Sequence, residues 1–115
     1  MLIYFLPMFF SKDSIDTKKA YEELHNESVI VLDVRTKEEY ASGHIEGSVN
    51  IDIRRPSFLE EIDALPKDKK CIVYCQSGGR AGVALGIMKK SGFENVSNLK
   101  GGIMEWKEKG MPVVR

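Results

Sequence analysis

The stretch CQSGGR is the part of this sequence whose residue types and spacing best suit covalent chemistry. It directly follows the apolar run at residues 71–74 and directly precedes a helix-like stretch that begins at Ala81. Its members are Cys75, Gln76, Ser77, Gly78, Gly79 and Arg80. A thiol at the end of a predicted strand, followed by two glycines and an arginine, can form an anion-binding loop around a nucleophile.

The turn from strand into helix explains why such a loop suits an anionic sulfur. It points several backbone N–H groups at one spot, and the helix N-terminus adds a partial positive charge there. Gly78 and Gly79 adopt left-handed conformations without penalty, so we expect the loop to curl around the Cys75 sulfur and to favour the thiolate. Arg80 supplies a nearby cation that can also hold an oxyanion through two parallel hydrogen bonds.

A purely structural interpretation of these residues competes with the catalytic one. A cysteine at a strand end is often a small core residue, and two glycines are often only a turn. We keep that interpretation for Cys71, which lies inside the apolar run. For Cys75, the order of strand, cysteine, glycine pair, arginine and helix favours a nucleophile.

The elements that position this loop follow from the apolar pattern. Strands are predicted at residues 29–32, 71–74 and 96–99. Helices are predicted from caps at Asp13 and Ser14 through Leu24, and after the capping-box patterns at 36–39 and 57–60. A further helix is predicted over 81–90, with one face formed by Val83, Ala84, Ile87 and Met88. The last is predicted after Gly101-Gly102, and its Met104 and Trp106 are expected in the core. This alternation predicts an α/β domain with a mainly parallel sheet, whose reactive groups lie at the carboxyl ends of the strands.

Length and charge narrow the range of functions. The chain has 115 residues, which suits one ordinary domain. Its seventeen Lys and Arg residues balance seventeen Asp and Glu residues. A neutral balance gives no electrostatic reason to expect a nucleic-acid partner, because phosphates are normally met by a clustered basic surplus.

The cysteines and histidines argue against a disulfide and against a metal. On an extended strand the Cα atoms of Cys71 and Cys75 would lie roughly 13 Å apart, which is too far for a disulfide. Unbridged thiols suit a reducing compartment such as the cytoplasm. Neither His25 nor His44 has ligand spacing with the thiols, so we expect no metal and no cofactor.

Residues 1–12 form an apolar segment ahead of the single domain that we expect over residues 13–115. Its first ten residues, MLIYFLPMFF, are fewer than the roughly 20 that span a bilayer and lack the features of a signal peptide. We therefore expect no membrane partner and predict that the segment packs on the core, for instance as an edge strand, since Pro7 cannot lie in a central one. A processed or anchoring segment and an exposed surface that recruits a partner are the alternatives.

Several stretches together resemble the rhodanese family of sulfurtransferases, from about residue 13 onward. They are Val31–Arg35, Glu39-Tyr40 with Gly43–Ile51, Tyr74–Ala81, Gly92-Phe93, and Leu99–Gly102 with Trp106. The family's active loop runs from a cysteine through four residues to an arginine or a small polar residue, as residues 75–80 do here. CQSGGR alone would carry little weight, whereas the combination is specific.

The resemblance implies a rhodanese-like fold, a five-stranded and mainly parallel sheet flanked by helices on both faces, in a single-domain form. It also implies that Cys75 takes a sulfur atom from a small anionic donor such as thiosulfate, holds it as a persulfide and passes it to cyanide or a thiol in a ping-pong cycle. The amides of residues 76–80 would stabilise the sulfur anion. A protein persulfide donor or acceptor would suit the loop as well.

The same resemblance gives other residues secondary roles. Asp33 and Arg35 match family positions at a strand end near the active loop, where we expect hydrogen bonds that brace the loop and the neighbouring chain. A surface ion pair is the alternative for these two residues. His44 matches a structural turn and not a general base. Apart from the resemblance, the charge of Arg54-Arg55 either draws anionic donors to the pocket mouth or is solvated surface charge.

Two further functions remain open at this point. The first is a binding module that keeps the fold without catalysis, although such modules often lose the cysteine that this chain retains. The second is a phosphatase or arsenate reductase that uses Cys75. Cysteine-dependent phosphatases place five residues between cysteine and arginine, whereas this loop has four and therefore forms a narrower ring.

Overall fold

The computed structural model describes residues 13–26 and 28–115, so the predictions for residues 1–12 lie outside the described residues. In chain order the elements are β1 (Ser14–Ile15), α2 (Thr17–Glu23), β2 (Ile30–Asp33), α3 (Lys37–Ser42), β3 (Val49–Asn50), α4 (Phe58–Asp63), β4 (Cys71–Tyr74), α5 (Gly79–Lys90), β5 (Val96–Leu99) and α6 (Gly102–Glu108). Strands alternate with helices throughout, as the sequence pattern predicts.

The strands form one five-stranded sheet in the order β1-β5-β4-β2-β3. Every neighbouring pair in it is parallel, which confirms the predicted fold class. From β2 the chain moves to β3 on one side, whereas from β4 it moves to β5 on the other side. The direction of winding therefore changes between β2 and β4. In open α/β sheets the carboxyl ends of the strands at such a point border the ligand crevice.

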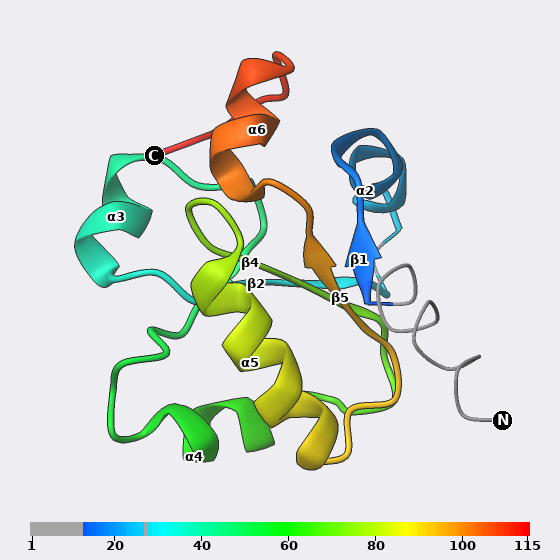
Figure 1. Cartoon of the computed structure of the whole chain (residues 1–115), viewed down its shortest axis with the longest axis vertical. Coiled ribbons are helices and arrows are strands. Elements are labelled where there is room, and N and C mark those ends of the chain that lie inside the picture. Colours follow the sequence, from blue (N-terminus) through cyan, green and yellow to red (C-terminus); the bar gives the residue numbers. More distant parts are fainter. Residues whose placement is uncertain (1–12, 27) are drawn as a thin grey trace, which may run out of the picture.

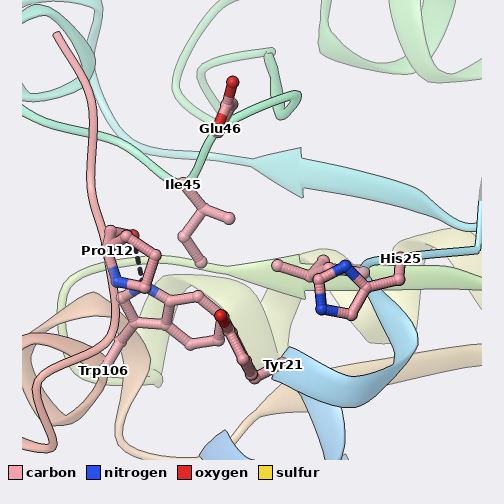
Figure 2. A pocket seen from close by; sticks show the side chains of 7 residues that line it. Tyr21, His25, Ile45, Glu46, Trp106 and Pro112 are labelled. Atoms are coloured by element: carbon pink, nitrogen blue, oxygen red, sulfur yellow. Dashed lines mark hydrogen bonds between the residues drawn. The ribbon is translucent and has the colours of Figure 1, made fainter.

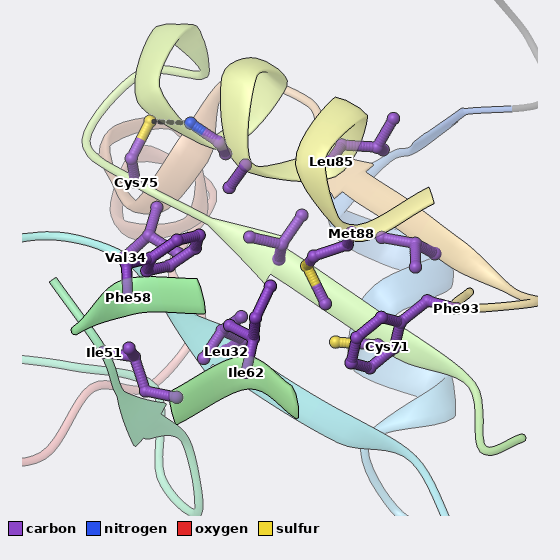
Figure 3. Close-up of a cluster of buried hydrophobic side chains, with 14 residues drawn as sticks. Leu32, Val34, Ile51, Phe58, Ile62, Cys71, Cys75, Leu85, Met88 and Phe93 are labelled. Carbon is purple, nitrogen blue, oxygen red and sulfur yellow. Dashed lines mark hydrogen bonds between the residues drawn. The ribbon is translucent and has the colours of Figure 1, made fainter. Parts of the chain in front are cut away.

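Helices cover both faces of the sheet, as predicted (Figure 1). One core contains the buried side chains of α4 and α5, and Figure 3 shows it. The other core contains those of α2 and α6. Successive residues of β4 alternate between the two cores, so that Val73 and Cys75 lie in the first whereas Ile72 and Tyr74 lie in the second. The register of β4 thus decides which face receives the Cys75 thiol.

The start of α2 differs from the prediction. Asp13 and Ser14 are not its caps, because Ser14 and Ile15 form the edge strand β1 beside β5. Asp16 is the N-cap, and its side chain accepts a hydrogen bond of 2.8 Å from the Lys19 N–H. Backbone bonds to β5 keep the preceding residues extended, so the helix begins at the first capping residue after the strand.

Only one of the two predicted capping boxes forms. The Thr36 box at the start of α3 is complete, because both reciprocal hydrogen bonds between Thr36 and Glu39 are present. The pattern at residues 57–60 does not cap α4. The Ser57 hydroxyl instead donates a hydrogen bond to the side chain of Glu61, one residue beyond the expected partner.

Two apolar residues predicted to be buried are exposed. The sheet-facing residues of α5 are Ala81, Ala84, Leu85 and Met88, whereas Val83 is 61% exposed. Residues two apart do not share a helix face, so burial of Ala81 turns Val83 outward. Met104 on α6 is 44% exposed, and Trp106 on the same helix is 1% exposed and lies in the core as predicted.

Within residues 13–26 and 28–115, no helix is both long enough and apolar enough to cross a membrane.

Candidate active site

Cys75 directly follows β4, and the loop after it wraps around its sulfur. The Sγ atom accepts hydrogen bonds from the backbone N–H groups of Gly78 at 3.1 Å and Ala81 at 3.3 Å, the second of which is drawn in Figure 3. Cys75 is 1% exposed, so these donors largely take the place of water around the sulfur. Of the amides predicted to surround the sulfur, those of residues 76–80, only that of Gly78 donates to it in the described part of the chain, and the second donor, Ala81, lies just beyond the predicted loop.

Gly78 makes the sharp turn that aims these donors. It is the N-cap of α5 and has a φ of 124°, a conformation that residues with a Cβ rarely adopt. Gly79 is already the first residue of the helix and does not have a positive φ. Only one of the two glycines therefore uses the conformational freedom that the sequence suggested for both.

The start of α6 supports the loop from the other side. The N–H of Ile103 donates to the Cys75 carbonyl at 3.0 Å, and the N–H of Met104 donates to the Gln76 carbonyl at 3.1 Å. Gly102 permits this approach. A Cβ at Gly102 would lie 2.7 Å from the Cys75 carbonyl oxygen and closer still to that of Gln76. Sequence reasoning found the Gly101-Gly102 pair but missed this contact with the loop.

Gly102→Ala is expected to push α6 away from the loop, because its Cβ meets backbone and its φ is +62°. We expect a loss of about 1–3 kcal/mol in the free energy of unfolding, together with slower sulfur loading of Cys75. Urea unfolding and loading kinetics measure these effects. The matched control is Gly86→Ala, where nothing lies within 4 Å of the new Cβ. Equal unfolding free energies for the two variants would contradict the proposed close contact.

Arg80 lies in the first turn of α5, and its guanidinium forms an ion pair with a carboxylate. Its Nη1 and Nη2 atoms donate to the two carboxylate oxygens of Glu39 at 2.7 and 3.0 Å. The hydrogen bond from Arg80 contributes most to lowering the pKa of Glu39, which falls to about 2. The same bond raises the pKa of Arg80. The cation predicted at the end of the loop is thus present, but it is paired.

Asp33 and Arg35 form a second ion pair, which is buried and not on the surface. The Nη2 atom of Arg35 lies 2.7 Å from the Asp33 carboxylate and also donates to the Gly43 carbonyl at 2.7 Å. Their side chains are 0% and 2% exposed, respectively. Burial tends to lower the pKa of Arg35, but the hydrogen bond and the charge of Asp33 raise it overall.

This buried pair braces the chain next to the loop. Besides the contact with Gly43 at the end of α3, the backbone carbonyls of Asp33 and Arg35 each accept a hydrogen bond of 3.0 Å from the Asn50 side chain. Within the described part of the chain, neither the Asp33 nor the Arg35 side chain makes a hydrogen bond to residues 75–80. The expected direct hydrogen bonds to the loop are therefore not found, and the pair braces only the neighbouring chain.

Tyr74 is a supporting residue that the sequence did not single out. Its side chain points to the face opposite Cys75, where its hydroxyl accepts a hydrogen bond from the Ile45 N–H at 3.1 Å and lies 3.3 Å from the Ser48 hydroxyl. Burial raises its pKa, so the hydroxyl stays protonated. Tyr74 thereby fixes the turn that contains the predicted Gly43–Ile51 motif.

The remaining predicted residues have other partners, and none of them donates a hydrogen bond to the Cys75 sulfur in the described part of the chain. His44 lies in the turn predicted for it, where its Nδ1 atom is 2.9 Å from the Tyr40 carbonyl and its ring stacks on Tyr40. Arg55 pairs with Glu61 at 3.2 Å, and Arg54 is exposed. That these two arginines attract anionic donors stays a prediction. If reversing their charge changes neither the kinetics with thiosulfate nor the salt dependence of those kinetics, the prediction is wrong.

Cys71 is the structural counterpart of Cys75. Both thiols are free, but Cys71 lies inside β4 with an exposure of 0%. Burial raises the pKa of Cys71 from its ordinary value of 9.0 to about 12. The thiol is therefore neutral at the pH values at which a cysteine nucleophile works.

This pKa predicts how stability depends on alkaline pH. Between about pH 9 and 12 the unfolded chain loses the Cys71 proton while the folded chain keeps it, so the stabilising effect of the neutral thiol is lost as pH rises through this window. In Cys71→Ala the contribution of this one titrating group to the pH dependence of the free energy of unfolding should be absent. Urea unfolding of both proteins between pH 8 and 12 measures it. Parallel slopes for the two proteins would disprove the assignment.

A separate pocket of about 280 Å³ lies on the α2 and α6 side of the sheet (Figure 2). Its lining residues are Tyr21, Leu24, His25, Ile45, Glu46, Trp106 and Pro112. None of them belongs to the predicted site, and Cys75 lies in the opposite core. Among the residues that the structure describes, no group of three or more His, Cys, Asp or Glu side chains could hold a metal ion.

Comparison with known proteins agrees with the motifs. A family model described as the rhodanese-like domain matches residues 16–109. A sulfurtransferase of Allochromatium vinosum is 34% identical over 104 residues, which cover 89% of this chain and 94% of that protein. The crystal structure of a rhodanese-related protein from Thermoplasma volcanium superposes with a TM-score of 0.80 at 36% identity, covering 89% of this chain and 97% of that chain. The predicted resemblance is confirmed.

Other relatives contain a similar region within a longer chain. A tRNA uridine(34) hydroxylase of Oceanobacillus iheyensis is 33% identical over 104 residues, which cover 87% of this chain but only 32% of that protein. The present chain therefore spans about a third of the length of that relative. Similar domains occur in proteins with different overall activities, so the function of this chain has to be argued from its own site.

Proposed function

The chain belongs to the rhodanese-like family, and on that premise we propose that it is a sulfurtransferase that carries a sulfur atom on Cys75 as a persulfide. The observation that carries the proposal is the pair of N–H donors, from Gly78 and Ala81, aimed at the Cys75 sulfur. Such donors stabilise a sulfur anion before and after the transfer. The start of α5 adds the partial positive charge of a helix N-terminus at the same place.

The proposed cycle has two balanced steps. In the first, the Cys75 thiolate attacks the outer sulfur of thiosulfate, a new S–S bond forms, and sulfite leaves with the electron pair of the broken bond. In the second, an acceptor such as cyanide attacks the terminal sulfur of the persulfide and leaves as thiocyanate, which regenerates the thiolate. A thiol acceptor would take the sulfur in the same way. No metal or redox cofactor is needed for either step.

The alternatives receive less support from the site. A binding module without catalysis has no need of a cysteine that accepts two backbone N–H groups. A phosphatase or arsenate reductase would need room for a tetrahedral oxyanion, whereas this loop has four residues between Cys75 and Arg80 and pairs Arg80 with Glu39. Because both thiols are free, we place the activity in a reducing compartment such as the cytoplasm.

Intact-protein mass spectrometry before and after incubation with thiosulfate tests the proposal. We expect the mass to rise by one sulfur atom and to return to its starting value when cyanide is added, with one equivalent of thiocyanate formed. A persulfide donor such as glutathione persulfide should give the same adduct. If neither donor loads the protein, it is not a sulfurtransferase, and turnover of an aryl phosphate or of arsenate would then support the phosphatase or reductase alternative.

A further inference from the structure

Glu39 and Arg80 join the two chain segments that leave the sheet on either side of its switch point. Glu39 lies in α3, which follows β2, whereas Arg80 lies at the start of α5, which follows β4. Their bidentate contact, at 2.7 and 3.0 Å, connects residues 41 positions apart. It is therefore a contact across the crevice where a donor would approach Cys75.

The Glu39 carboxylate is held in place before it meets Arg80. Its Oε1 atom accepts hydrogen bonds from the Thr36 N–H at 3.0 Å and from the Thr36 hydroxyl at 3.1 Å. These bonds belong to the capping box of α3. A carboxylate fixed in this way loses little additional freedom when the guanidinium binds, so the pair is firmer than an ordinary surface pair.

The pairing changes what Arg80 offers to an incoming anion. A guanidinium binds a thiosulfate or sulfite group best through two parallel N–H groups, and Nη1 and Nη2 of Arg80 are already turned toward Glu39. The pair also carries no net charge. The attraction that remains in the loop comes from backbone N–H groups and the helix N-terminus, which amount to about half an elementary charge.

We propose that Glu39 determines donor specificity by masking the charge of Arg80, so that the site favours sulfur donors of low charge, such as persulfides and thiosulfonates, over dianionic thiosulfate. This inference rests on the proposed sulfurtransferase function and narrows its donor class. Glu39 acts through Arg80 and is a positioning residue, since its carboxylate contacts Arg80 and Thr36 and not the sulfur.

Two donors that differ in charge but not in chemistry can test this idea. Thiosulfate carries two negative charges and releases sulfite, whereas methanethiosulfonate carries one and releases methanesulfinate. Each gives its outer sulfur to the Cys75 thiolate and forms the same persulfide. The ratio of their kcat/KM values therefore reports the electrostatic preference of the site, independently of the reactivity of Cys75.

Glu39→Gln is the deciding variant, because an amide oxygen at the Oε1 position can still accept the Thr36 hydrogen bonds. For an assumed separation of about 6 Å between the freed charge and the donor, and the dielectric constant of water, Coulomb's law gives about a threefold gain in kcat/KM per negative charge of the donor. We therefore expect about a tenfold gain with thiosulfate and about a threefold gain with methanethiosulfonate. The gain should appear mainly in KM and disappear at high ionic strength, where the charge is screened.

The matched control is Glu38→Gln, which removes the same charge from the same helical turn. Glu38 is exposed and makes no ion pair in the described part of the chain. The ratio of the two donors should stay within about twofold of the wild-type ratio. Arg80→Gln provides a second test that does not depend on the Glu39 variant, because it leaves Glu39 unpaired and should shift the ratio in the opposite direction, against thiosulfate.

The outcomes separate this inference from the function on which it rests. If wild-type protein forms no adduct with thiosulfate, methanethiosulfonate or glutathione persulfide, both proposals fail. If it forms the adduct but Glu39→Gln leaves the donor ratio unchanged, or shifts it no more than Glu38→Gln does, only the role of Glu39 is wrong. A Glu39→Gln protein that does not fold, combined with an unchanged ratio in Arg80→Gln, would also overturn the inference.

Discussion

Cys75→Ser is expected to abolish sulfur transfer, with no mass gain from thiosulfate and no thiocyanate after addition of cyanide. A serine hydroxyl fits the space, but it is a far weaker nucleophile and cannot form a persulfide. The rate of thiocyanate formation should fall by at least about a thousandfold. Mass spectrometry of the loaded protein and a colorimetric thiocyanate assay measure the two effects. This is the largest change in activity that the site predicts.

Cys71→Ala is the matched control for that experiment. It removes the other thiol of the same strand, and Cys71 makes no contact with the loop through its sulfur in the hydrogen bonds described above. Loading of one sulfur should persist in this variant. An adduct that survives in Cys75→Ser and disappears in Cys71→Ala would show that Cys71, and not Cys75, is the nucleophile.

Arg35→Met is expected to have the largest effect on stability. It leaves the Asp33 carboxylate buried without its partner and removes the donor to the Gly43 carbonyl. Removing one member of a buried ion pair typically costs about 3–5 kcal/mol. Urea unfolding should show a loss of this size in the free energy of unfolding, and a domain of ordinary stability would then be only marginally folded at 25 °C.

An exposed ion pair provides the comparison. Lys67 and Asp63 approach to 2.9 Å, but both side chains are more than a third exposed. Lys67→Met should therefore change the unfolding free energy by no more than about 1 kcal/mol. A double variant that replaces Asp33 by Asn together with Arg35→Met should regain part of the loss, because the unpaired charge is gone. A loss of less than about 1 kcal/mol in Arg35→Met alone would show that water or another group compensates Asp33.

Local patterns predicted the parts of this fold that depend on local physics. The apolar run at 71–74, the turn after Cys75 and the Thr36 capping box each concern residues within a few positions of one another, and each is present as expected. The carboxyl edge of a parallel sheet is a property of topology, which the alternation of strands and helices also predicts. The sequence alone therefore suffices to place Cys75 and its loop at this edge of the sheet.

Contacts between distant segments could not be predicted in this way. Nothing near Arg80 in the sequence indicates that its guanidinium will pair with Glu39. Likewise, nothing near Gln76 indicates that N–H groups of α6 will donate hydrogen bonds to the carbonyls of the loop. Val83 was misplaced for a related reason, because only the angle at which α5 packs on the sheet decides which side of the helix is covered. Such details depend on packing geometry, which a single sequence records only indirectly.

The hydrogen bonds from α6 to the loop have a consequence for the newly made protein. A ribosome produces Cys75 well before it produces Ile103 and Met104, whose N–H groups hold the carbonyls of Cys75 and Gln76. During that interval the growing chain has its thiol but not the complete support of the loop. Premature termination before α6 would therefore leave a cysteine whose loop lacks these two hydrogen bonds, so the site is complete only after α6 has been made.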